Sequence, residues 1–514
     1  MLNFQAWLES PSAIRGILIE AGVLKYNGST WVDTKVYLSN IGYLTKDSLT
    51  SFLPIIIGGA KFTESISIDG SLSMSFGDLE LANYNGEYDD WLDSSKYIWV
   101  NKPIQVYYGD PTISSISLSD IKINTFEKIF DGIISDIDTR SRDSINIKVR
   151  DKLERLNTPI TETKIGSYGT WAQGQTNQDS ISPIVFGEVF NISPILVDPS
   201  TLQYRFNTGV TEGVIEIRDN GVPITPIVNL TTGTFVLTSN SAGAITASIQ
   251  GIKQSVNLTN GTILNTYKNS AVNLIALIVL AYGNSISKLT ASDLDLTNLA
   301  TFDSTHTQSV GIPITERVNV LDVCTQLASS IGLQLYFNRY GLLQILKLGQ
   351  YTTDPIRYIT DSDILFHSLE VSSRIPVTAA TKLGYCRDYT LQDNLLTNIP
   401  PSHKDIFSTE WYTTTIKDEA VKTTYSLYTD PTQKDTLLLS GSEATAEAAR
   451  LNNMFKVPRT VYKMTCSSKF LSLKLGQEAN ISHNRYGLTT GKSGQVITVS
   501  PNWLNSTVDI EVLI

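Results

Sequence analysis

The segment from residue 487 to residue 493 (GLTTGKS) comes nearest in this chain to a phosphate-binding loop. A P-loop needs four residues between its two glycines, so that backbone N–H groups surround the phosphates, and it needs a helix directly after it. Here only three residues separate the glycines, and the following residues 494–499 (GQVITV) have the pattern of a strand. The segment is therefore predicted to be a hairpin loop without a bound nucleotide.

Histidines that could act as bases or metal ligands are scattered. No HExxH string is present to indicate a zinc protease, and no GxSxG string indicates a hydrolase. General acid–base chemistry would then fall to carboxylates. The four histidines are His306, His367, His403 and His483.

Two acidic clusters could supply paired carboxylates, Glu87/Asp89/Asp90 and Asp293/Asp295. Neither lies in a recognisable pocket motif. A chain with 50 Asp and Glu residues contains such pairs by chance, so both clusters are predicted to be solvated surface.

The three cysteines, Cys324, Cys386 and Cys466, lie far apart, without a CxxC pair or a neighbouring histidine that could complete a zinc site. They are predicted to be buried free thiols. The chain therefore has no predicted catalytic, cofactor-binding or metal-binding residues, no cofactor, and no enzymatic activity.

Composition limits the remaining classes of function. At 514 residues the chain is too long for one hydrophobic core, and 41% hydrophobic residues with 18% charged residues are typical of folded domains. The net charge of −10 is the opposite of what a phosphate-neutralising nucleic-acid binder needs. The many aromatic residues are interpreted as core and cross-strand partners rather than as a carbohydrate-binding groove.

Neither secretion nor membrane insertion is predicted. The first eight residues lack a basic region followed by an apolar core, so a signal peptide is not expected. The longest apolar run, residues 271–282, is much shorter than the roughly 20 residues that span a bilayer. It is predicted to be a buried helix in a protein made in the cytoplasm.

Residues 1–160 are predicted to form a small antiparallel β-barrel. Apolar residues alternate with small or polar residues in the runs 65–78, 104–109, 128–137 and 144–151, which indicates strands with one buried face. Residues 83–91 mix turn formers with aromatics and acids, and they are predicted to be a surface loop or one helical turn.

Residues 161–265 are predicted to be an inserted β domain, and residues 266–365 a small α+β domain. In the first, Asn220-Gly221 lies between two β-branched runs, which is a strong hairpin signal. In the second, the helix 271–282 is followed by an amphipathic helix at 318–331 and a hairpin at 333–346.

Residues 366–514 are predicted to form a second barrel with one helix, residues 442–455, which Ser442 could cap. The fold class expected is mainly β with a small α+β part: two small antiparallel barrels, an inserted β domain and a helix–hairpin unit. The last four strands are expected at 461–464, 479–483, 495–499 and 507–513.

Four segments, in this order, resemble tail-tip hub proteins of long-tailed bacteriophages and of gene transfer agents. Each string is a simple pattern of hydrophobic residues and glycines, and it is their order along most of the chain that makes the resemblance. The segments are 130–153, 183–194 with Tyr204 and 214–222, 318–346, and 473–488.

The resemblance implies a structural virion protein, the central hub of a tail tip or baseplate. It implies a homotrimer in which each chain contributes two similar barrels, so that the ring matches a hexameric tail tube. Expected partners are tail tube or distal tail proteins, the tape measure protein and tip or fibre proteins. DNA would only pass through the lumen, where a net negative wall would keep it from adhering. Unlike some relatives, the chain is expected to carry neither an iron–sulfur cluster nor a peptidoglycan-cutting domain.

Two other functions stay open at this stage. A receptor- or glycan-binding tail protein could use the Thr-, Ser- and Asn-rich block 165–262, although no low-complexity stalk accompanies it. A secreted polysaccharide hydrolase on a β scaffold would be favoured by a signal peptide or a paired-carboxylate motif, and neither is found.

Overall fold

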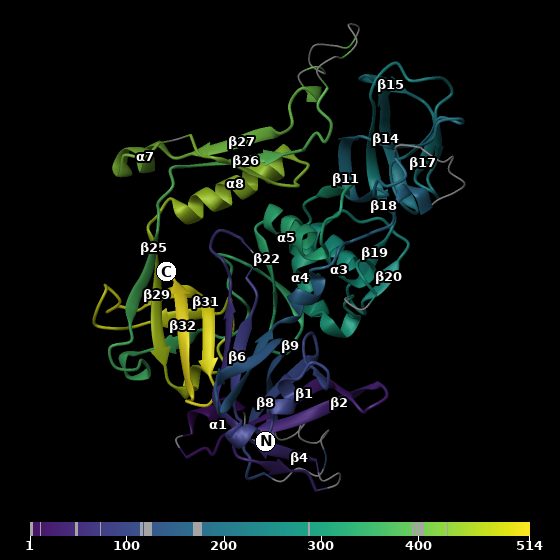
Figure 1. Cartoon of the computed structure of the whole chain (residues 1–514). Coiled ribbons are helices and arrows are strands. Elements are labelled where there is room, and N and C mark those ends of the chain that lie inside the picture. Colours follow the sequence, from purple (N-terminus) through teal and green to yellow (C-terminus); the bar gives the residue numbers. More distant parts are fainter. Residues whose placement is uncertain are drawn as a thin grey trace. The chain divides into compact units, whose positions relative to one another are not determined.

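The computed structural model of the chain describes residues 4–10, 12–46, 50–71, 73–113, 117, 126–167, 177–285, 288–392, 395, 399, 404, 406–428 and 430–514. Contacts divide the chain into two compact units (Figure 1). The first consists of Met1–Glu154, Tyr336–Ile375 and Arg459–Ile514, and the second of Arg155–Leu335 and Pro376–Pro458. Each unit is therefore built from segments that are distant in the sequence.

One continuous sheet forms the first unit, in the order β25-β29-β32-β31-β5-β6-β10-β9-β8-β1-β2-β4-β3, with β7, β24 and β30 attached at its sides. The N-terminal strands are β1 (Gly16–Tyr26), β2 (Trp31–Ser39), β3 (Tyr43–Leu44), β4 (Ser51–Pro54), β5 (Ile56–Ser65), β6 (Phe76–Ala82), β7 (Tyr97–Ile98), β8 (Pro103–Gly109), β9 (Phe126–Ser141) and β10 (Ser144–Arg150). The later strands are β23 (Leu343–Lys347), outside the large sheet, and β24 (Arg357–Ile359), β25 (Glu370–Ile375), β29 (Arg459–Cys466), β30 (Glu478–Ile481), β31 (Lys492–Asn502) and β32 (Thr507–Leu513).

The two ends of the chain meet where β31 pairs with β5. This antiparallel pairing sets Thr498 opposite Ser65 and Asn502 opposite Lys61. Side chains on the buried face reinforce the junction: the ring of Trp503, which is 1% exposed, lies 4.8 Å from that of Tyr108. In Figure 1 the yellow C-terminal strands accordingly run beside β6. The N-terminal and C-terminal strands therefore share one sheet and one core.

Alternation of apolar and polar residues explains why these strands have one buried face. In β32, Val508, Ile510 and Val512 are fully buried, and the residues between them are partly exposed. In β10 the buried apolar set is Ile145, Ile147 and Val149. Successive side chains of a strand point to opposite faces, so one face is dry and the other can carry charge.

The strand expected at residues 65–78 is wrong. Residues 66–75, of which Leu72 lies outside the described residues, connect β5 to β6. Asp69 accepts a hydrogen bond from the backbone N–H of Ser71, and Gly70 has a φ of 84°. Small and polar residues can alternate with apolar ones in a turn as well as in a strand, so the pattern does not distinguish the two. A turn forms here because Asp69 and Gly70 favour turn conformations.

Short helical segments in the first unit are α1 (Phe4–Glu9), η1 (Tyr84–Gly86), η2 (Asp89–Leu92), η4 (Lys152–Leu156, reaching the second unit), η7 (Asp361–Asp363) and η8 (Ser468–Phe470). The two turns η1 and η2 confirm the surface loop or helical turn expected at 83–91. Strand β22 (Leu333–Phe337) leads the chain back into the first unit, and its hairpin with β23 confirms the one expected at 333–346.

The second unit contains a five-stranded sheet, β15-β14-β18-β11-β21, and three smaller sheets. Its strands are β11 (Ile184–Ile192), β12 (Ile195–Asp198), β13 (Gln203–Arg205), β14 (Thr211–Asp219), β15 (Val222–Ile224), β16 (Ile227–Asn229), β17 (Thr234–Val236), β18 (Ile245–Ile252), β19 (Ser255–Asn257), β20 (Thr262–Leu264), β21 (Gly311–Ile314), β26 (Ala380–Tyr385), β27 (Tyr412–Lys417) and β28 (Gln433–Asp435). The hairpin at Asn220-Gly221 is confirmed: both residues have positive φ, as a tight two-residue turn requires.

Helices of the second unit are η5 (Ile165–Ser167), α3 (Ala271–Ala281), η6 (Ala291–Asp293), α4 (Leu296–Thr305), α5 (Val320–Ser330), α7 (Glu419–Tyr425) and α8 (Gly441–Phe455). The helices expected at 271–282, 318–331 and 442–455 are confirmed. Ser442 is not the cap of α8, because Ser440 precedes the helix. No helix of the described residues is both long and apolar enough to cross a membrane.

The predicted fold class, mainly β with a small α+β part, is confirmed. No closed ring of hydrogen-bonded strands is found in the described part of the chain. The strands β1 to β10 of the first predicted barrel share one continuous sheet with β25 and β29 to β32 of the second, whereas β26, β27 and β28 of the second predicted barrel form a separate three-stranded sheet. The four domain ranges, 1–160, 161–265, 266–365 and 366–514, stay a prediction.

Candidate functional site

The polar side of the continuous sheet carries rows of charged side chains, which we call the ladder face. One row crosses four strands: Lys61 of β5 stands opposite Asp78 of β6, which stands opposite Lys148 of β10. Lys148 in turn faces Asp136 of β9. A second row begins at the sheet edge, where Glu370 of β25, Lys463 of β29 and Glu511 of β32 follow one another. The ladder face thus runs through both ends of the chain.

Ion pairs connect neighbouring strands of the ladder face. The Lys148 Nζ lies 2.6 Å from Asp138 and 3.1 Å from Asp136. The Arg140 guanidinium reaches over β10 to Asp78 and Glu80. Opposite charges on adjacent strands each contribute roughly 0.2–1 kcal/mol, so together they favour this register.

The join between the two halves has its own ion pair. The Lys61 Nζ donates to Asp509 at 2.7 Å, from β5 to β32. The Thr63 and Ser500 hydroxyls are hydrogen-bonded at 2.5 Å next to it. Burial by itself would raise the pKa of Asp509, but hydrogen bonds from Lys61 and Thr465 outweigh it and hold that pKa below its usual value. Asp509 therefore stays ionised.

Ammonium and carboxylate groups on the ladder face sustain one another's charge. A hydrogen bond from Lys148 lowers the pKa of Asp138, and the same contact raises the pKa of Lys148. The nearby charge of Asp78 raises the pKa of Arg140. These side chains are partly exposed to solvent, which screens the charges, so each pair adds little stability. What they determine is the electrostatic character of a broad wet surface.

Acids exceed bases in these rows. Carboxylates repel the phosphates of a nucleic acid. Each base that could attract phosphates lies in an ion pair, Arg150 with Glu154 outside the rows and the other bases with carboxylates of the rows. A wet face of this kind can border an aqueous passage for an anionic polymer without binding it. The acids are Asp78, Glu80, Asp136, Asp138, Glu370, Asp509 and Glu511, and the bases are Lys61, Arg140, Lys148, Arg150 and Lys463.

Reversing charge on β9 is expected to make the ladder face retain DNA. In the double variant D136K/D138K, Lys148 loses both of its carboxylate partners. Three lysine side chains, at positions 136, 138 and 148, then lie next to one another. Duplex DNA should then bind at about 50 mM salt and be released near 200 mM, as expected when lysines neutralise phosphates. Electrophoretic mobility of labelled duplex measures this.

The matched control is E162K/D179K, which changes the net charge equally at two exposed acids of the second unit. It should leave DNA mobility as in the wild type. Equal DNA retention by both double variants would show that net charge alone matters and that the ladder face has no special role.

Chemical motifs considered in the sequence lie apart from the ladder rows. Residues 487–491 of the P-loop-like segment lie in the connection between β30 and β31, with Gly487 and Gly491 at φ of 71° and 76°, and Lys492 begins β31. The expected hairpin loop is confirmed. Glu87, Asp89 and Asp90 are exposed, as expected. Asp293 closes a capping box with Thr290, and the Asp295 side chain accepts from the Asn298 N–H at the start of α4.

The cysteines and histidines are not brought together among the described residues. Cys324 and Cys466 are buried free thiols, and burial raises the pKa of both; Cys386 is free but only partly buried. His306 is buried, and His483 lies 2.6 Å from Asp361. His403 lies outside the described residues. No group of three potential metal ligands is found in the described part of the chain.

The ladder face was missed in the sequence, although its strands β9, β10, β29, β31 and β32 were expected. The alternation in residues 144–150 and 507–513 indicates which side chains share a face. It carries no signal for which strands become neighbours, and the two rows lie in one sheet only because β5 pairs with β31.

No protein-family model and no curated protein sequence matches the chain. Solved structures show weak similarity to it. The 43 kDa tail protein of prophage MuSo2 from Shewanella oneidensis has 10% identity and a TM-score of 0.40, with 97% of this chain and 98% of that chain covered.

Two further structures are similar at the same level. A tail protein from Neisseria meningitidis MC58 has 8% identity and a TM-score of 0.40, covering 91% of this chain and 94% of that one. A chain in the virion of a native gene transfer agent has 9% identity and a TM-score of 0.41, covering 70% of this chain and 91% of that one. Matches of this strength assign neither a family nor a function to the chain.

Proposed function

We propose that this chain is a structural virion protein, the central hub of a phage tail tip or baseplate. Three copies form a ring around the DNA exit channel, and the ladder face of each copy lines that channel. The ring joins the tail tube to the tip and host-attachment proteins. The chain catalyses no reaction in this role.

The observation that carries the proposal is the continuity of the sheet through β31 and β5. A channel wall that is built from a β-sheet can use an unbroken hydrogen-bonded surface with one wet side and one dry side. Pairing at Thr498–Ser65 and Asn502–Lys61 gives the first unit such a surface from both ends of the chain. The acidic excess of the ladder face and the ordered resemblance to hub proteins support the same role.

The purified full chain is expected to form a particle with three times the 56.6 kDa chain mass. Light scattering coupled to size-exclusion chromatography, at several concentrations, measures the mass. A ring needs copies that associate through their edges, so the particle should persist on dilution to micromolar concentration.

A particle that stays monomeric at every concentration would contradict the hub. If a monomer were also stabilised against heat by sugars, the result would favour the glycan-binding tail protein, because a ligand that binds only the folded state raises its stability.

A further inference from the structure

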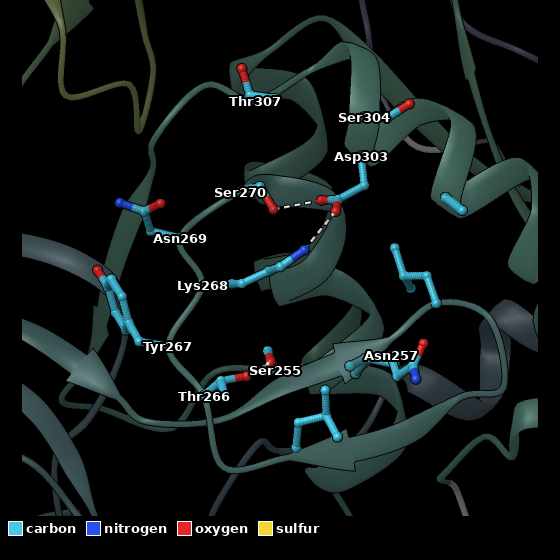
Figure 2. Close-up of a pocket in the computed structure, with 14 residues that line it drawn as sticks. Ser255, Asn257, Thr266, Tyr267, Lys268, Asn269, Ser270, Asp303, Ser304 and Thr307 are labelled. Atoms are coloured by element: carbon cyan, nitrogen blue, oxygen red, sulfur yellow. Dashed lines mark hydrogen bonds and ion pairs between the residues drawn. The ribbon is translucent and has the colours of Figure 1, made fainter.

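A pocket of about 670 Å³ opens in the second unit between the hairpin β19–β20 and the helix α4. The extended residues 266–270, which lead into α3, form its third side (Figure 2). Its volume is within the range of about 300–1,000 Å³ that is typical of small-ligand sites. Neither the ladder face nor the proposed hub role makes use of this pocket.

One ion pair lies at the centre of the pocket. Figure 2 shows Lys268 and Ser270 both directed at Asp303. The Lys268 Nζ lies 3.2 Å from Oδ2, and the Ser270 hydroxyl donates to Oδ1 at 2.5 Å. The Asp303 side chain is only 11% exposed, whereas that of Lys268 is 49% exposed. The carboxylate is therefore held by two donors, and the Lys268 side chain is the more exposed member of the pair.

Both charged groups keep hydrogen-bonding capacity. A carboxylate has about four lone-pair sites and an ammonium group three N–H donors, and these contacts use only part of each set. An incoming hydroxyl group can donate to Asp303 while another accepts from Lys268. Hydrogen bonds to charged groups are stronger than neutral ones, so this pair can orient a ligand rich in hydroxyl groups.

The rest of the lining divides into polar side chains and an apolar part. The Ser255 and Thr266 hydroxyls are hydrogen-bonded to each other at 2.6 Å, which fixes the hairpin against residues 266–270. Beside them, Leu264 and Ala300 offer apolar surface, and Val256 and Leu258 line the pocket as almost fully buried side chains. Sugar rings present C–H groups on their faces and hydroxyls at their edges, and this lining complements both. Besides Ser270, the hydroxyl and amide side chains are Ser255, Asn257, Thr266, Tyr267, Asn269, Ser304 and Thr307.

The charge balance of the pocket selects among ligand classes. A phosphate or carboxylate approaching Lys268 would be repelled by Asp303, and a cation approaching Asp303 would be repelled by Lys268. A neutral molecule with many hydroxyl groups meets neither repulsion.

We propose that this pocket is a binding site for a short neutral oligosaccharide. The site is separate from the hub role, and its presence does not depend on the oligomeric state of the chain. The pocket lies in the second unit, so sugar binding there does not use the residues of the ladder face, which belong to the first unit.

The test uses the full-length chain with two neutral trisaccharides, chitotriose and maltotriose, and with inorganic phosphate as the anionic probe. Saturation-transfer NMR is expected to show saturable binding of at least one trisaccharide, with a Kd on the order of 1 mM for an open pocket. The variants K268M and D303N should each weaken it by about tenfold or more.

Lys253 provides the control. Its side chain is 42% exposed and lies 3.0 Å from Glu212, so K253M removes a comparable lysine and ion pair outside the pocket. K253M should bind the sugar as the wild type does. Thermal melting of each variant checks that it is folded, and K268M, at the exposed end of the pair, keeps the test decisive if D303N unfolds.

Three outcomes would overturn the proposal. In the first, neither trisaccharide gives a saturable signal. In the second, folded K268M binds the sugar as tightly as the wild type. In the third, phosphate competes for the site in a Lys268-dependent way, which would make it an anion site. A monomeric particle would refute the hub and leave the sugar result standing.

Discussion

Replacing Arg339 by methionine should lower the free energy of unfolding of the first unit by about 3–5 kcal/mol. Arg339 lies in the turn between β22 and β23, and its side chain is 8% exposed. The guanidinium donates to the carbonyls of Leu471 at 2.8 Å and Leu473 at 2.5 Å. It also lies 3.7 Å from the carboxylate of Glu64, which is equally buried. R339M leaves two carbonyls and one carboxylate without this cation.

The loss should increase with pH. Burial raises the pKa of Glu64, and Arg339 counteracts that rise. In R339M the pKa of Glu64 rises further, so at low pH the carboxyl is neutral and the fold tolerates it. As pH increases, Glu64 must either ionise in the core or keep a proton that solvent would take. Urea titrations at pH 5 and pH 8 measure the difference.

Two comparison variants isolate the buried pair. R150M removes an arginine whose contact with Glu154 is largely exposed, and it should cost no more than about 1 kcal/mol. The double variant E64Q/R339M should recover part of the stability because the buried charge is gone. Equal effects of R339M and R150M would refute the role of Arg339 in the core.

The second large effect is a dependence of stability on pH that arises from Asp151. This carboxyl is 2% exposed, and it accepts from the Ser75 N–H at 2.6 Å and the Leu153 N–H at 3.0 Å. Burial raises its pKa from 3.8 to about 7, against the effect of those two hydrogen bonds. The folded state therefore holds a proton that the unfolded chain releases above about pH 4.

The sign follows from proton linkage. The contribution of Asp151 to stability is complete below about pH 4 and is lost as pH rises through 7, with a slope of about 1.4 kcal/mol per pH unit. In D151N the group no longer titrates, although one backbone N–H loses its acceptor. The difference in unfolding free energy between wild type and D151N should fall by roughly 4 kcal/mol from pH 4 to pH 8.

Unfolding of both proteins in urea across that pH range measures the difference. The variant D138N should show the opposite pH dependence of stability. Lys148 lowers the pKa of Asp138, so the contribution of Asp138 to stability is lost only at acid pH. Parallel stability curves for wild type and D151N would show that Asp151 does not carry a proton in the folded state.

Much of the local structure was determined by the sequence. Alternation specified β10 and β32, Asn220-Gly221 specified a hairpin, and an apolar run specified α3. These signals act between neighbouring residues, where steric limits on φ and the period of each element decide the result. The same logic failed at residues 66–75, because small polar residues alternate in turns as well as in strands.

Tertiary structure alone decided which of these elements meet. Alternation fixes the face on which Lys61 and Asp509 lie, but it names no partner strand, and these two residues are 448 positions apart. The local sequence places Arg339 in a turn, where an exposed side chain would be expected. Only the tertiary structure buries its guanidinium next to Glu64. Lys268 and Asp303 form a pocket because α3 folds back against α4 between them. Long-range burial and charge compensation decide such contacts, and a single sequence does not encode them in any local pattern.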